Sequence, residues 1–383
     1  MQANQVTTTK QGYTDNPDPI AAVDELWAQI EQPDITLVLI FCSANYDLDR
    51  ISDQLEKVTG GVLVVGCTTA GELCAGGHRE NSISAASFAK PDFFATTRVI
   101  EHVRDFAVGS YHKLIQAMVA EIGQEAPDLD DSQLFAVLLV DGLCAQEEAI
   151  ISSIYNSLGD IPIFGASAGD SLNFSRTHVL HQGRFREDIA VITLVGTHCP
   201  FKVFKTEHFE GSDTKMVVTR ADPINRIVTE INGDPAGREY ARLVDLPETE
   251  LSPMVFASHP VVVRVGGELY VRSIQKVNED ESLTFFCAID EGIVLTVAKG
   301  VGLIKNLEEK FQALREEIGD IQLTIGCDCI LRRLELEQND ELEKAAALLR
   351  QNHVIGFNTF GEQFQSMHVN QTFTGVAIGY RRD

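Results

Sequence analysis

The sequence has few basic residues and no long apolar run. Of its 383 residues, 31 are Lys or Arg and 56 are Asp or Glu, which gives a formal net charge of -25 at pH 7. Such a chain repels the phosphates of nucleic acids and of anionic lipids, so we expect no nucleic-acid or membrane-surface role. A membrane-crossing helix needs about 18 or more apolar residues in a row, and no stretch of the sequence reaches that length. The N-terminus also lacks the apolar stretch of a secretory signal, and we therefore expect a cytoplasmic protein.

Cysteine motifs are also missing. The eight cysteines are scattered, mostly within apolar runs, and no Cys-x-x-Cys pair occurs. This excludes the covalent attachment site of a c-type haem and argues against a disulfide framework, so we expect reduced thiols. Cys327 and Cys329 form the closest pair, and alternation along a strand would place both thiols on one face. Two thiols without a nearby third ligand favour buried structural cysteines over a metal site, and redox activity stays open.

Motifs of enzymes are incomplete. Residues 165–169 match the G-x-S-x-G nucleophile elbow, with Ser167 as the nucleophile. An elbow must lead into a helix, whereas residues 170–176 have no helical period, so a structural turn is favoured. Residues 300–302 (Gly-Val-Gly) lack the third glycine of a dinucleotide loop, and no H-E-x-x-H zinc motif occurs. We expect a protein that is not an enzyme.

A repeated order of elements is the most informative feature of the first half. Residues 35–41 form an apolar run that predicts a strand buried on both faces, and an amphipathic helix and a second strand follow. The same order recurs further along the chain. In both copies the second strand runs into a turn of small residues, and residues 69–72 (TAGE) align with residues 167–170 (SAGD) at an offset of 98. The sequence therefore predicts an internal duplication of a β-α-β-β unit, over about 35–100 and 134–205.

The predicted fold class is α/β followed by α+β. We expect residues 19–210 to form one pseudo-symmetric α/β domain built from the two copies. Residues 211–383 have short strands joined by turns, with helices on one side, and are expected to form a mixed, largely antiparallel α+β domain. Residues 1–18 are polar and are predicted to be a flexible N-terminus.

Three of the ten histidines stand out by their sequence context. His259 precedes a proline and a buried-looking strand, His353 enters the strand before GFNTFGEQ, and His368 lies between two apolar strands. Each is a candidate ligand, although a single histidine of this kind more often has a structural role, with its ring hydrogen-bonded.

Several separate motifs resemble the FIST proteins, in which an N-terminal FIST domain is joined to a C-terminal FIST domain. The motifs are VGCTTAGEL (65–73), FGASAGD (164–170), EINGDPAGREYARL (230–243), GFNTFGEQ (356–363) and HVNQTFTGVAIG (368–379). The resemblance extends over nearly the whole chain from about residue 35. The last motif, the two-domain length and the absence of an F-box or methyl-accepting region look most like the NosP branch of haem-based nitric oxide sensors.

This resemblance implies a b-type haem held without a covalent bond, with a histidine on the iron and an exchangeable sixth position. His368 is the first candidate for the axial ligand, His259 the second and His353 the third. Nitric oxide on ferrous iron would weaken the bond to the histidine and alter contact with a signalling partner. In this branch the partner is typically a histidine kinase or a cyclic-di-GMP enzyme, in two-component regulation and biofilm control.

The resemblance also suggests residues for the rest of the site. Haem propionates need cations, and the candidates are Arg264 and Arg272 on neighbouring strands, or Arg332 and Arg333 after the cysteine pair. A solvated edge, or a pair with one of the abundant carboxylates, is an equally simple role for each arginine. The polar residues predicted to line the pocket are Glu362, Gln363, Asn370 and Gln371.

Two other functions stay open. A FIST-type protein without haem would sense an organic ligand such as an amino acid, bound in the cleft between the two domains. A serine hydrolase would use Ser167. The sequence favours binding over catalysis, because no base, nucleophile and orienting acid have a spacing that indicates a catalytic set. Homo-oligomer formation also stays open.

Overall fold

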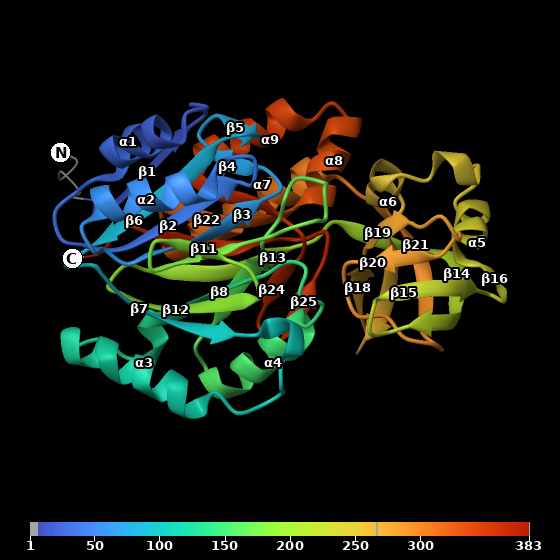
Figure 1. Ribbon diagram of the computed structural model, residues 1–383, viewed down its shortest axis with the longest axis horizontal. Helices are drawn as coiled ribbons and strands as arrows, with labels where there is room; N and C mark the ends of the chain where they lie inside the picture. Colours follow the sequence, from blue (N-terminus) through green and yellow to red (C-terminus); the bar gives the residue numbers. More distant parts are fainter. Residues whose placement is uncertain (1–6, 266, 383) are drawn as a thin grey trace.

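The computed structural model describes residues 7–265 and 267–382. Within these residues the strands form four sheets, three of six strands and one of eight. Figure 1 shows three of the sheets and most of the helices in one body, and the fourth sheet in a separate lobe. The prediction of a mixed α/β chain is confirmed. Among the helices of the described residues, none has the length and apolar character that a membrane crossing requires.

The body consists of three units with the same order of elements, except that unit 3 has two helices, α8 and α9, where units 1 and 2 each have one. Unit 1 comprises β1 (Thr9–Thr14), α1 (Pro19–Ile30), β2 (Ile35–Ser43), α2 (Leu48–Thr59), β3 (Val64–Thr69), β4 (Glu72–Cys74), β5 (Gly77–Arg79) and β6 (Ile83–Ala89). Unit 2 comprises β7 (Phe93–Glu101), α3 (His112–Glu125), β8 (Leu134–Val140), α4 (Glu147–Leu158), β9 (Ile163–Ser167), β10 (Val179–His181), β11 (Arg184–Arg186) and β12 (Ile189–Thr197). Unit 3 comprises β13 (Phe201–Thr206), α7 (Leu303–Ile318), β22 (Ile321–Cys329), α8 (Ile330–Gln338), α9 (Leu342–Gln351), β23 (Val354–Thr359), β24 (Glu362–Phe364), β25 (Met367–Val369) and β26 (Phe373–Gly379).

The separate lobe interrupts unit 3 between β13 and α7, and we call its residues, 209–300, the insert. Its elements are β14 (Phe209–Asp222), β15 (Ile227–Ile231), β16 (Asp234–Pro235), α5 (Ala236–Leu243), α6 (Pro253–Ser258), β17 (Val261–Val265), β18 (Glu268–Arg272), β19 (Ile274–Val277), β20 (Leu283–Phe285) and β21 (Val294–Gly300). All strand pairs within the insert are antiparallel, and they form the eight-stranded sheet.

The three units exchange hairpins in a cycle. The sheet of unit 1 has the order β1-β6-β2-β3 and is extended by β10-β11 of unit 2. In the same way the sheet of unit 2, β7-β12-β8-β9, takes β24-β25 of unit 3, and the sheet of unit 3, β13-β26-β22-β23, takes β4-β5 of unit 1. In each unit one pair of strands is parallel: β2 with β3, β8 with β9, and β22 with β23. The exchange closes the body into a pseudo-threefold arrangement.

Alternation along the central strands explains how the body is packed. In β8, Phe135, Val137 and Leu139 point into a core shared by all three sheets. The alternate side chains of β8, Ala136 and Leu138 among them, pack against α3 and α4. The predicted burial of such strands on both faces is therefore confirmed, because one face meets helices and the other meets the neighbouring sheets.

The strand pairing divides the chain differently from the sequence prediction. Residues 211–383 were expected to form one domain, but the insert pairs with itself and residues 303–379 return to the body as unit 3. The expected flexible N-terminus is wrong for residues 9–14, which form β1 and pair with β6. Residues 1–6 lie outside the described residues.

Candidate functional site

Each unit has a turn after its second parallel strand, and these turns contact one another. Each strand before a turn contains a glycine, Gly66, Gly165 or Gly356, which lies close to a carbonyl oxygen of the neighbouring strand. Ala70 of the first turn donates its backbone N–H to Asn358 O of the third, and similar bonds join the other pairs of turns. The repeated motifs of the sequence therefore meet in one region of the body.

The exchanged hairpins give three equivalent positions, defined by strand register. In each, a glycine pairs with one residue of the hairpin, and that residue pairs across the hairpin with another. The three sets are Gly66, Leu180 and Phe185; Gly356, Leu73 and His78; and Gly165, Gln363 and His368. Two sets have leucine in the middle, whereas the third has Gln363. A polar side chain where the fold elsewhere places leucine marks the third position as different.

Buried polar atoms without hydrogen-bond partners gather at this third position. Gln363 Nε2 lies 3.1 Å from Ser167 Oγ and 3.2 Å from His368 Nδ1, but within residues 7–265 and 267–382 Gln363 Oε1 and His368 Nε2 have no partner. The other unpaired atoms are both amide atoms of Asn370, Gln371 Oε1, Arg272 Nε and Nη1, and Ser273 Oγ. We call Gln363, His368, Asn370, Gln371, Arg272 and Ser273 the buried polar cluster.

The cluster joins the body to the insert. The first four of its residues belong to unit 3, whereas Arg272 and Ser273 belong to the insert, and β18, which ends at Arg272, contacts β25, which carries His368. A buried polar atom left unpaired costs about 1–3 kcal/mol, and native proteins pair nearly all such atoms with protein or water. Several unpaired donors and acceptors in one place are therefore typical of a site that a polar guest completes.

Charged side chains lie beside the cluster. Arg226 of the insert donates from Nη2 to Glu147 (2.7 Å) and to Glu148 (2.6 Å), at the start of α4. Burial lowers the pKa of His368, against the opposing effect of Glu148 and Glu147, so the ring is neutral at pH 7. The positive charges of Arg226 and Arg272 balance the two carboxylates, and the region carries no net charge.

Three phenylalanine rings form an apolar contact next to the cluster. Phe174 comes from unit 2, Phe286 from the insert and Phe360 from the turn of unit 3, and their ring centroids are 4.9–5.7 Å apart. Gln371 donates from Nε2 to the carbonyl of Ala257 (3.0 Å), which packs in the same hydrophobic group. The cluster is thus bounded by aromatic side chains from three parts of the chain.

A buried carboxyl lies directly beside the cluster. Glu362 precedes Gln363 and accepts hydrogen bonds from Thr359 and from Thr372 Oγ1 (2.7 Å). Burial raises its pKa to about 8, although these donors oppose the shift. Glu72 of unit 1 has the same arrangement with its own hydroxyl donors, and burial raises its pKa to about 7. The pair shows that the turns of units 1 and 3 are built alike.

Several sequence-predicted residues come together here. His368, Arg272 and Gln371 belong to the cluster, and Glu362 adjoins it. His259 is near, at the end of α6, where its Nδ1 lies 3.0 Å from Ser258 Oγ. Ser167 also touches the cluster, but its hydroxyl meets the amide of Gln363, which cannot act as a general base.

The other predicted residues lie elsewhere. Arg264 is exposed and donates to the carbonyl of Gly267, and His353 is exposed at the entry to β23. Arg332 is buried in α8 and donates to Asp328 (2.6 Å).

The two neighbouring cysteines are buried free thiols. Cys327 packs in the shared core and Cys329 packs beside Phe360. Burial raises the pKa of both thiols, which makes them poor nucleophiles. In the described part of the chain no group of three or more His, Cys, Asp or Glu side chains is placed to hold a metal ion.

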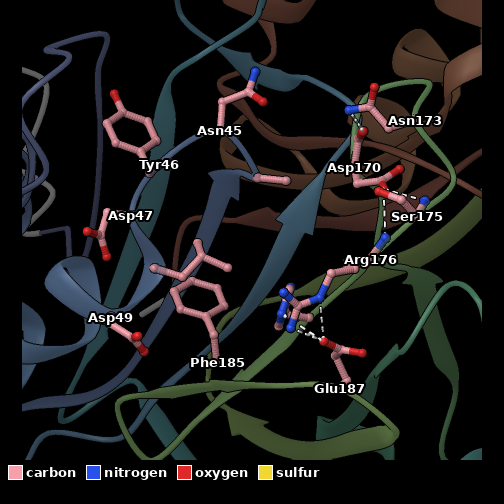
Figure 2. Close-up of a pocket in the computed structure, with 13 residues that line it drawn as sticks. Asn45, Tyr46, Asp47, Asp49, Asp170, Asn173, Ser175, Arg176, Phe185 and Glu187 are labelled. Carbon is pink, nitrogen blue, oxygen red and sulfur yellow. Dashed lines mark hydrogen bonds and ion pairs between the residues drawn. The ribbon is translucent and has the colours of Figure 1, made fainter.

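The equivalent place between units 1 and 2 is an open pocket of about 560 Å³, shown in Figure 2. Asp49 lies there at the start of α2, as Glu148 lies at the start of α4, and Phe185 takes the place of His368. Glu187 in this pocket is paired with Arg176. All the residues that line it come from units 1 and 2. The insert therefore covers one of the equivalent positions and leaves this one open.

Comparison with known families gives two matches. The FIST N domain matches residues 36–234 and the FIST C domain matches residues 236–365. The boundary between the two matches falls inside the insert. A comparison with curated proteins found no match. Because the first family match alone spans more than half of the chain, the protein belongs to the FIST family, which is associated with sensing in signal transduction.

Proposed function

We propose that this protein is a sensor that binds a small polar molecule in the buried polar cluster and transmits the binding to a signalling partner. The observation that supports the proposal is the set of unpaired buried atoms on Gln363, His368, Asn370 and Gln371, opposite Arg272. The set contains donors and acceptors together. A guest that completes it must therefore offer both kinds of group.

The chemistry of the unpaired atoms suggests an amino acid. The buried Nε and Nη1 of Arg272 have no partner within the described residues, and unpaired guanidinium donors bind a carboxylate through charge-assisted hydrogen bonds. The free amide oxygens of Gln363 and Gln371 accept hydrogen bonds from an ammonium group. The phenylalanine rings beside the cluster suit an apolar side chain. We infer an α-amino acid or a close relative as the ligand.

Thermal unfolding with single amino acids tests this proposal. A ligand that binds only the folded protein stabilises it by RT ln(1 + [L]/Kd), which is about 2.7 kcal/mol at a hundred times Kd. The unfolding temperature is therefore expected to rise with the logarithm of ligand concentration for at least one amino acid. If no amino acid at concentrations up to about 10 mM raises the unfolding temperature, the proposal is contradicted.

Gln363→Leu is the sharpest variant, because Leu180 and Leu73 occupy the equivalent positions of the other units. The variant is expected to fold, since the equivalent positions accept leucine, and to lose the ligand-induced rise in unfolding temperature. It removes one buried unpaired oxygen but also the contacts of Gln363 Nε2 with Ser167 and His368. Arg272→Met is expected to lose the response as well. Arg264→Met, on the exposed end of the neighbouring strand, is the matched control and should keep it.

Haem-based nitric oxide sensing is the second function that we propose. The observation in its favour is the buried, unpaired Nε2 of His368. As they stand, however, the surrounding residues do not fit a haem. A Cβ added at Gly361 would lie 2.7 Å from His368 Nε2, so Gly361 packs closely against this end of the ring, and the neighbouring side chains are polar. Bound haem would supply an iron centre for nitric oxide.

Absorption spectra decide between the two proposals. If haem binds, the reconstituted protein should show a Soret band shifted from that of free haem, and nitric oxide should move it. His368→Ala should then lose the shift, whereas His353→Ala should keep it, because His353 is exposed. A spectrum identical to free haem in the parent protein would remove this second candidate.

We propose a histidine kinase or a cyclic-di-GMP enzyme as the partner. The net charge of -25 favours a basic docking surface on the partner, through long-range attraction. Kinase autophosphorylation with and without the protein, at low and high salt, provides the assay.

A further inference from the structure

The insert is attached to the body through a narrow neck. The chain enters the insert after His208 and leaves it at Gly300, and β14 and β21 begin their pairing there, with Phe209 opposite Gly300. The two crossings are bonded to each other, because Val301 donates its backbone N–H to the carbonyl of His208 (2.7 Å). Both connections therefore run side by side, which is the geometry of a two-stranded hinge.

A buried network fixes the base of this neck on α8. The His208 side chain is fully buried between Arg332, whose Nη1 lies 2.9 Å from Nδ1, and Glu335, which lies 2.9 Å from Nε2. Arginine can only donate, so Nδ1 is an acceptor and Nε2 carries the proton that is donated to Glu335. Burial lowers the pKa of His208 and keeps the ring neutral. The neck has one defined anchor point.

A second attachment lies beside the buried polar cluster. Arg226, in the turn after β14, is buried and has a left-handed backbone (φ 56°). It reaches across to Glu147 and Glu148 of α4 and donates from Nη1 to the carbonyl of Phe286. Ala288 donates its N–H to Glu148 (2.7 Å). We call these contacts the Arg226 latch.

The cluster is enclosed between the two sides that the latch joins. Its four residues from unit 3 and Ser273 are buried and Arg272 is partly buried, whereas the corresponding pocket between units 1 and 2 is open and is lined by those units alone. A molecule from solution therefore reaches the cluster only if the insert moves. Contacts between units of one chain commonly allow such movement.

We propose that the insert is a hinged cover of the ligand site, which turns at the His208 neck and closes through the Arg226 latch. The inference rests on the proposed ligand site and adds its regulation. Ions in a buried pair lose hydration that they regain when exposed, so a latch of this kind sets the closed geometry without making opening prohibitive. A ligand that contacts Arg272 on one side and His368 on the other favours the closed form, because it bonds both sides only there.

Cys287 is a native residue whose reactivity can report on opening, so no cysteine has to be introduced. It is fully buried and lies between Phe286 and Ala288, which both contact the latch. Cys67 and Cys327 are equally buried, but they belong to the shared core of the body. Of these three thiols, opening of the cover exposes only Cys287, whereas global unfolding exposes all of them.

Modification by N-ethylmaleimide, followed by mass spectrometry of each cysteine, tests the cover in the whole chain. In the parent protein Cys287 is expected to react at least tenfold faster than Cys67 and Cys327. Arg226→Gln is expected to raise the Cys287 rate at least tenfold again and to leave the core thiols unchanged. Arg220→Gln, at an exposed arginine of β14, the strand before the turn that carries Arg226, should change none of the rates.

Two results would overturn the cover: equal rates for all three cysteines in the parent, or a parallel rise of all three in Arg226→Gln. The parent comparison applies even if the variant does not fold. The outcome is separable from that of the ligand proposal. Stabilisation by an amino acid without selective reaction of Cys287 removes the cover and keeps the site. Selective reaction of Cys287 without stabilisation by any amino acid supports the proposed cover and contradicts the proposed ligand.

Discussion

Replacing Glu362 with glutamine is expected to stabilise the protein relative to the parent as the pH rises, by about 5 kcal/mol between pH 4.5 and pH 9. The parent carboxyl is fully buried, and burial raises its pKa from 4.5 to about 8. It therefore keeps its proton in the folded protein at a pH where the unfolded chain has lost it. Glutamine does not titrate, so the variant lacks this loss of stability.

The sign follows from proton binding. Between pH 4.5 and pH 8 the folded protein holds one more proton at Glu362 than the unfolded chain, so the free energy of unfolding falls by about 1.4 kcal/mol for each pH unit. The contribution is complete below pH 4.5 and is lost as the pH passes 8. Burial raises the pKa of Glu72 to about 7, and the same reasoning gives about 3 kcal/mol for Glu72→Gln over a narrower window.

Urea unfolding of parent and variant at pH 5 and pH 9 measures the difference. Glu343→Gln serves as the control, because Glu343 is exposed on α9, and its difference from the parent should be independent of pH. If the free energies of unfolding of Glu362→Gln and the parent differ by the same amount at pH 5 and at pH 9, the carboxyl ionises normally in the folded state.

The local elements of the body were largely predictable from sequence, because the body satisfies simple patterns. Apolar runs predicted the central strands, and the run at residues 35–41 is observed within β2, Ile35–Ser43. Helical periodicity predicted α2, the amphipathic helix that follows this strand. The duplication could be recognised because units 1 and 2 follow each other along the chain without an insertion, so equivalent segments recur at a nearly constant spacing.

The third unit was not recognised, because the insert separates its parts. Gly165 follows Gly66 by 99 residues, but Gly356 follows Gly165 by 191, and the extra 92 residues equal the length of the insert, 209–300. The apolar start of α8 also reads as a continuation of β22, so the helix was missed. A comparison that permits one long gap would align residues 66–72 with 356–362.

The candidate site was only partly predictable for a related reason. Gln371 and His368 lie in a motif that the sequence already singled out. Glu147 and Glu148 begin a helix, where acidic residues are common and usually exposed, and Arg226 lies in an ordinary-looking turn. Their burial exists only because the insert folds back onto α4, and no local pattern encodes that contact.

Gly356→Ala is expected to destabilise the protein by more than about 3 kcal/mol, the upper range for forcing an added methyl into a packed interior. A Cβ at this position would lie 1.8 Å from the backbone oxygen of Gly326 in the neighbouring parallel strand. The obstacle is backbone, which cannot move without breaking the pairing of β22 with β23. Gly66→Ala and Gly165→Ala would each place a Cβ 1.9 Å from the equivalent carbonyl, so the three losses should be similar.

Gly123→Ala is the matched control, because Gly123 lies in α3 with nothing within 4 Å of an added Cβ. There the same substitution should stabilise the protein by about 0.5–1 kcal/mol, through better helix propensity. Urea unfolding of the four variants measures all of these differences. The three close glycines are equivalent only if unit 3 is a true counterpart of units 1 and 2. Tolerance of alanine at Gly356 alone would therefore separate unit 3 from the other two, whereas equal losses at 66, 165 and 356 support a body of three like units that the insert interrupts once.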